Sequence, residues 1–75
     1  MWCVTIQCSD DSWRIHGKTF KAIAERYPAN LLSSKKMPGD GLRIMSYQVE
    51  EVNDAEEFTD ECQKLAGFTA VFESL

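Results

Sequence analysis

The chain has 75 residues, of which 44% are hydrophobic and 27% are charged, a composition typical of a small globular domain. This composition excludes a disordered chain, and no apolar run approaches the roughly 18 residues that a membrane span requires. A chain of this length buries only about 60–65% of its unfolded surface, so one domain with a thin core is expected over residues 1–75. A large active site enclosed between two domains is therefore excluded.

Charge is distributed unevenly along the chain, whose net charge is −4. Residues 1–43 contain seven basic and four acidic side chains, whereas residues 44–75 contain one basic side chain, Lys64, and eight acidic ones. An acidic protein is repelled by phosphates unless it gathers its cations on one face. Nucleic acid is therefore a disfavoured partner, and nothing in the sequence indicates a membrane.

The three cysteines are Cys3, Cys8 and Cys62. An odd number at irregular spacing is not a disulfide framework, and no pair has the spacing of a zinc knuckle or a redox motif. Reduced cysteines are typical of cytoplasmic proteins, so a cytoplasmic location is expected. We find no motif for a metal or another cofactor and expect neither.

The first half of the chain predicts a strand followed by a helix. Apolar and polar residues alternate over residues 2–8, and the turn formers of residues 9–12 then end the strand. A helical stripe follows and stops at Pro28. Its members are Phe20, Ile23, Ala24 and Tyr27.

The start of this helix is ambiguous. Trp13 and His16 extend the stripe backwards toward Asp11, but Gly17 costs about 1 kcal/mol inside a helix. We expect the later start, near Lys18. A short strand over residues 13–16 is the alternative.

The middle of the chain predicts a hairpin. Residues 30–36 form a weak strand whose two lysines suit the edge of a sheet. Residues 37–41 are the strongest turn signal, because proline and glycine favour a tight reversal. Residues 42–51 form a longer strand, with Met45, Tyr47 and Val49 facing inward.

The last third predicts a second helix and a final strand. Asn53 is the expected N-cap, with Glu56 completing a capping box, and Gly67 is the expected left-handed residue at the end. The apolar stripe consists of Ala55, Phe58, Cys62 and Leu65. Residues 68–75 alternate as a strand.

This order of elements predicts a ferredoxin-like β-α-β-β-α-β fold, with both helices on one face of a four-stranded antiparallel sheet. The outer face of that sheet lacks the aromatic side chains with which RNA-binding domains of this fold stack bases. Its mixture of small polar and aliphatic side chains suits a protein interface. We expect a homodimer that forms through this face and the last strand. The residues assigned to self-association are Thr5, Gln48, Thr69 and Val71.

The leading functional hypothesis is a small non-enzymatic binding or regulatory module, of the inhibitor or adaptor type, that acts through protein–protein contacts. A short stand-alone chain of this kind would suit a virus or mobile element. Its protein partner is not identified by the sequence. The expected partner-binding residues are Trp13, as an aromatic anchor, and the acidic side chains Glu56, Glu57, Asp60 and Glu61 of the second helix.

Two alternatives remain open. In the first, Lys35, Lys36 and Arg43 around the hairpin bind single-stranded nucleic acid, which requires steeply salt-dependent affinity. In the second, the chain is a small dimeric enzyme with a pocket near Cys8 and His16, bordered by Tyr47.

Overall fold

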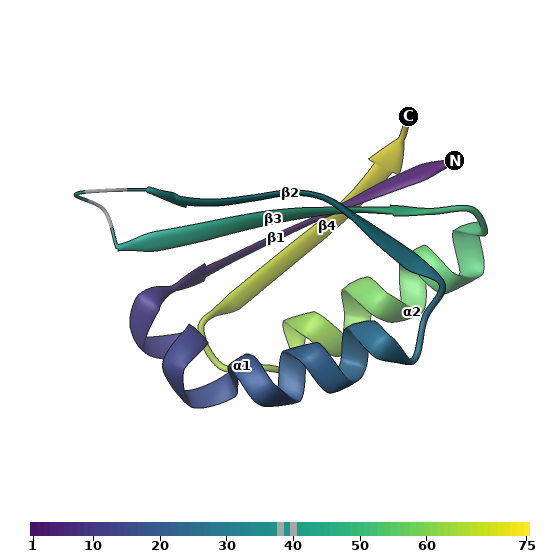
Figure 1. Cartoon of the computed structure of the whole chain (residues 1–75). Coiled ribbons are helices and arrows are strands. Elements are labelled where there is room, and N and C mark those ends of the chain that lie inside the picture. Colours follow the sequence, from purple (N-terminus) through teal and green to yellow (C-terminus); the bar gives the residue numbers. More distant parts are fainter. Residues whose placement is uncertain (38, 40) are drawn as a thin grey trace.

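The computed structural model describes residues 1–37, 39 and 41–75. Within these residues, six elements follow one another along the chain (Figure 1). They are β1 (Trp2–Ser9), α1 (Asp10–Glu25), β2 (Ala29–Met37), β3 (Leu42–Val49), α2 (Val52–Gln63) and β4 (Phe68–Ser74). Each strand matches a predicted strand to within two residues at either end.

The strands form one antiparallel sheet in the order β2-β3-β1-β4, and α1 and α2 lie side by side on one of its faces (Figure 1). This is the ferredoxin-like arrangement that the sequence predicts. β2 and β4 are the edges of the sheet. The first and last residues meet beside the start of β1 and the end of β4, where the Leu75 amide donates to the Met1 carbonyl at 3.2 Å.

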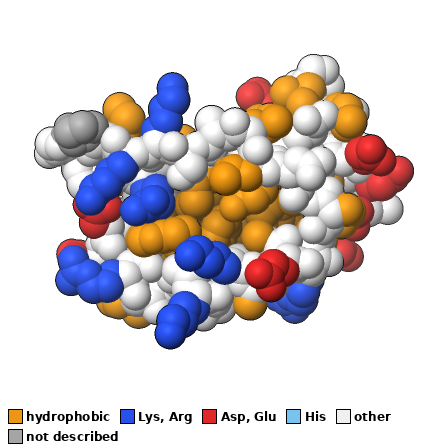
Figure 2. Space-filling view, in the orientation of Figure 1, with side chains coloured by type: hydrophobic (Ala, Val, Ile, Leu, Met, Phe, Trp, Pro, Cys, Tyr) orange, Lys and Arg blue, Asp and Glu red, His pale blue; other side chains and the backbone are white. Residues whose placement is uncertain are grey.

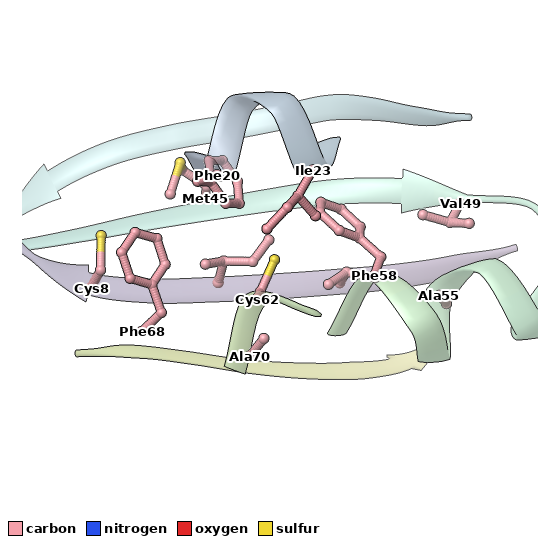
Figure 3. Close-up of a cluster of buried hydrophobic side chains, with 12 residues drawn as sticks. Cys8, Phe20, Ile23, Met45, Val49, Ala55, Phe58, Cys62, Phe68 and Ala70 are labelled. Carbon is pink, nitrogen blue, oxygen red and sulfur yellow. The ribbon is translucent and has the colours of Figure 1, made fainter. Parts of the chain in front are cut away.

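The core fills the space between the sheet and the helices (Figure 3). Phe20 of α1 lies at its centre, with ring centroids 5.8 Å from Phe68 and 6.3 Å from Phe58. The inward-facing residues are those that the alternation and the helical stripes predict. The fully buried large side chains are Val4, Ile6, Cys8, Phe20, Val49, Phe58 and Cys62.

The start of α1 corrects the sequence prediction. The helix begins at Asp10 rather than near Lys18, and residues 13–16 are helical rather than a strand. Ser9 is the N-cap, because its hydroxyl accepts a hydrogen bond from the Ser12 amide at 3.1 Å. Gly17 is buried within the helix, where a β-carbon would lie 3.5 Å from the Trp13 ring. The close packing of Gly17 against Trp13 therefore compensates for the low helix propensity of glycine.

The start of α2 also differs from the prediction. The N-cap is Glu51, whose carbonyl accepts from the Ala55 amide at 3.1 Å and whose side chain makes no capping hydrogen bond. Asn53 is inside the helix, so the predicted capping box does not form. Gly67 has a φ of 81°, as expected for a left-handed residue, but it lies beyond the last helical residue, in the turn before β4.

The β2–β3 hairpin extends from one end of the molecule (Figure 1). Its predicted turn includes Pro38 and Asp40, which lie outside the described residues. Gly39 and Gly41 have φ angles of 96° and 64°, which only glycine adopts easily. The pairing of β2 with β3 shifts between Leu31 and Ser33, so β2 contains an irregularity at Leu32.

Candidate functional site

Trp13 is placed in the core-facing half of α1 rather than in an exposed loop. Its ring centroid lies 5.7 Å from that of Phe20 and 4.5 Å from the Arg43 guanidinium carbon, and Lys21 Nζ lies 5.7 Å from it. The side chain is half-buried. Trp13 therefore packs against the core, and Arg43 and Lys21 lie over its ring. It is less free to insert into a partner protein than the sequence indicates.

The acidic surface of α2 consists of Glu56, Glu57 and Asp60, which are exposed, and Glu61, which is not. Glu61 accepts hydrogen bonds from Arg26 Nη2 at 2.7 Å and from the Tyr27 hydroxyl at 3.0 Å. Burial and the hydrogen bond to Glu61 raise the pKa of Tyr27. Glu61 therefore joins the two helices, and the other three carboxylates remain open to a partner.

The two parts of the predicted partner-binding surface are not neighbours. Trp13 lies near the beginning of α1, whereas Arg26, which contacts Glu61, follows its end. Thirteen residues at 1.5 Å each separate the two positions by about 20 Å along the helix axis. The structure thus places Trp13 with the hairpin cations and leaves the acidic surface by itself.

The cations of the hairpin do not share one face. Lys36 and Arg43 are direct partners across β2 and β3, on the helix-facing side. Lys36 Nζ lies 3.5 Å from an Asp10 carboxylate oxygen, and Arg43 stacks on Trp13. Lys35 pairs with Ile44 on the opposite face of the sheet. The three cations therefore do not form one continuous surface, which disfavours the nucleic-acid alternative.

An apolar patch next to these cations is the feature that sequence analysis missed. Leu31 and Leu32 of β2 are 55% and 49% exposed, and Leu31 pairs with the half-buried Tyr47 on the helix-facing side. Figure 2 shows hydrophobic side chains gathered between the hairpin and α1, with lysines and arginines toward the hairpin and along α1 and an acidic side chain at the opposite border. The strand β2 was predicted only as an edge. The signal in the sequence was its adjacent pair of leucines, because an edge strand with otherwise polar residues leaves such side chains exposed.

The outer face of the sheet has the predicted register. Thr5 pairs with Val71 across β1 and β4, and Cys3 pairs with Gln48 across β1 and β3. The four residues predicted for self-association therefore share one face, but only Thr5, Thr69 and Val71 lie beside the β4 edge. Val71 is 64% exposed. Gln48 lies on β3, on the far side of β1.

The residues named in the alternative enzyme hypothesis lie in the core or pack against it. Cys8 is buried, and burial raises the pKa of its thiol, although the Arg43 charge acts in the opposite direction. His16 packs its ring edge-on against Phe68, with centroids 6.3 Å apart. Burial likewise raises the pKa of Tyr47. A raised thiol pKa disfavours the thiolate that a nucleophile requires.

Three further features of the described residues bear on the site. They enclose no cavity between the sheet and the helices. They do not bring three histidine, cysteine, aspartate or glutamate side chains together in a way that could hold a metal ion. None of their helices combines the length and the apolar character that crossing a membrane requires.

Comparisons with known proteins bear on the fold. No protein-family model and no curated protein sequence matches the chain. Among solved structures, the chain is similar to the ACT domain from the GTP pyrophosphokinase of Chlorobium tepidum, with a TM-score of 0.65 and 13% sequence identity. The similarity covers 96% of this chain and 95% of that domain. It establishes the ferredoxin-like fold over nearly the whole chain.

Proposed function

We propose that the protein is a small non-enzymatic binding or regulatory module that works as a homodimer, located in the cytoplasm. The likeness to an ACT domain, which is one part of an enzyme, supports the role of a module rather than of a complete catalyst. Its three free cysteines suit a reducing compartment. The proposal depends most on one observation, the free and uncharged edge of β4.

β4 is an edge strand that pairs only with β1. Its segment from Phe68 to Phe72 contains no charged residue and no proline, the usual protections of a free edge. A symmetric antiparallel pair of this seven-residue strand places the central residue, Val71, opposite its copy, and Thr69 opposite Glu73. Two such edges complete a continuous sheet and bury the exposed Val71 side chains against each other.

The remaining surfaces are available to another protein. Glu56, Glu57 and Asp60 form an exposed acidic surface on α2, away from β2. Such a surface would bind a basic partner and would steer its approach. Dimerisation through β4 leaves this surface free in both copies.

The test is the mass in solution, measured by light scattering at micromolar concentration and at two salt concentrations. We expect a dimer for the unaltered protein and a monomer for Val71→Lys, because the substitution brings two lysines together at the centre of the paired strands. Val52→Lys is the matched control, since Val52 is also exposed but lies on α2. A monomeric unaltered protein, or equal effects of the two substitutions, would overturn the proposed dimer.

A further inference from the structure

β2 is an edge strand that the helices leave uncovered. It pairs only with β3, and each of its residues after Ala29 is exposed. α1 packs against β1 and β3, so the helix-facing side of the sheet remains open beside β2. The backbone groups on the free side of β2 can therefore accept a further strand.

The open side of β2 continues into the apolar patch, which consists of Leu31, Tyr47 and Trp13, and the exposed Leu32 follows Leu31 at the irregularity of β2. Leu31 is the cross-strand partner of Tyr47, and Tyr47 and Trp13 both contact the Phe20 ring, with centroids 6.0 Å and 5.7 Å away. The patch lies over the core and is hydrophobic at its centre (Figure 2). An exposed apolar surface with a polar margin is typical of a protein interface.

The margin of the apolar patch is mainly cationic on the side of the hairpin. β2 and β3 contain Lys35, Lys36 and Arg43 and no carboxylate, and Lys21 of α1 lies over Trp13. The Lys36 side chain is 61% exposed beside Asp10, so its ammonium can also donate to an incoming carboxylate, and such charge-assisted hydrogen bonds are stronger than neutral ones.

These features favour one kind of occupant. The described residues enclose no cavity, so a small molecule would remain largely exposed to solvent. A second copy that used the same face would bring the cations against themselves. Trp13 already contacts Gly17 and Arg43, which leaves its ring poorly placed to stack on a base.

We propose that β2 and the apolar patch bind an extended acidic segment of a partner protein, which adds to the sheet as a strand antiparallel to β2. Aliphatic side chains of the segment pack on Leu31, and its aspartate or glutamate side chains meet Lys35 and Lys36. This inference rests on the proposed role as a protein-binding module and specifies the chemistry of one partner. It uses the edge opposite to the one that we assign to self-association.

The test uses a fluorescent nine-residue peptide, with glutamates in the half that meets Lys35 and Lys36 and valines in the half that meets Leu31 and Leu32. We expect saturable binding by fluorescence anisotropy below about 1 mM peptide, an affinity within the range of weak specific contacts. The affinity should fall as the salt concentration rises. Backbone amides of β2 should become protected from hydrogen exchange, because an added strand would occupy the free edge.

Exchanging the charges between β2 and the peptide tests whether β2 is the binding surface. The double variant Lys35→Glu, Lys36→Glu should lose at least about tenfold in affinity for the acidic peptide and should instead bind a peptide with lysines in place of the glutamates. Lys64→Glu is the control, since it changes the charge of an exposed residue just beyond the end of α2, and it should retain binding. A further variant, Leu31→Ser, should weaken both peptides.

Three results would overturn the inference: no binding of the acidic peptide, equal loss in the Lys64→Glu control, or protection confined to β4 or α2. Saturable binding of a single-stranded oligonucleotide at β2 in place of the peptide would also overturn it. The dimer is tested separately, because Val71→Lys should abolish dimerisation and leave peptide binding intact. Failure of either proposal is therefore distinguishable from failure of the other.

Discussion

A buried thiol makes the stability of the folded protein depend on pH. Cys62 is completely buried between α2 and the sheet, and burial raises the pKa of its thiol to about 12, with a smaller contribution from Glu61. The folded protein therefore holds the Cys62 proton more tightly than the unfolded chain does. Above the unfolded pKa, near 9, unfolding releases this proton and becomes more favourable.

We predict that Cys62→Ala reduces the alkaline loss of stability. Between about pH 9 and pH 12, the Cys62 thiol removes up to about 1.4 kcal/mol from the free energy of unfolding for each pH unit. Urea unfolding at pH 7 and pH 10 measures this slope. The variant loses packing at both pH values but should lack this part of the slope, whereas Cys3→Ala should keep it. Equal slopes in the unaltered protein and in Cys62→Ala would contradict the assignment.

At the scale of elements, the two helices begin in different ways. Ser9 caps α1 with its hydroxyl, and Asp10 and Asp11 follow in the first turn, where the helix dipole favours negative charge. Glu51 caps α2 with its backbone alone. α2 therefore depends more on the packing of Ala55 and Phe58 than on its first residues.

Replacement of the two candidate caps tests this difference. Ser9→Ala should lower the free energy of unfolding by about 1 kcal/mol, because the Ser12 amide loses its acceptor. Asn53→Ala should be neutral or slightly stabilising, because Asn53 is exposed inside α2 and alanine has the higher helix propensity. Urea denaturation of both variants measures the two effects. A larger loss of unfolding free energy for Asn53→Ala than for Ser9→Ala would instead support the predicted capping box at Asn53.

The order and the facing of the elements could be predicted because each follows from local periodicity. Alternation over residues 2–8 and 68–75 predicts which side chains of β1 and β4 face inward, and the structure confirms this facing. The helix starts were harder, because Gly17 weakens a helix locally and is compensated by the packing of Trp13, a tertiary contact that no local pattern reveals. The apolar patch was missed for a similar reason. Its exposure depends on which strands α1 covers, and a strand's own sequence does not contain that information.

At the scale of the whole molecule, the charge asymmetry of the sequence becomes a separation in space. Cations gather around the hairpin and the beginning of α1, and the carboxylates Glu56, Glu57 and Asp60 lie on α2. Lys36 and Arg43 are engaged by Asp10 and Trp13. The net charge of −4 then opposes the approach of a polyanion.

We predict that a labelled single-stranded oligonucleotide shows no saturable binding in a low-salt titration. Long-range repulsion is least screened under these conditions, and the hairpin cations lie on opposite faces of the sheet rather than along one surface. The variant Glu56→Lys, Asp60→Lys reverses the charge of the acidic surface and should show measurable, salt-sensitive association. Tight binding by the unaltered protein that weakens steeply with salt would instead support the nucleic-acid alternative.

The contact between Leu75 and Met1 has a consequence for how this unit can be joined to others. Because the two chain ends emerge together, beside each other and at the opposite end of the molecule from the hairpin, the fold could be spliced into a surface loop of a host protein with little distortion of either. A short bridge between the same ends would allow the chain to be opened elsewhere as a circular permutant. In either arrangement the hairpin would project away from the point of attachment.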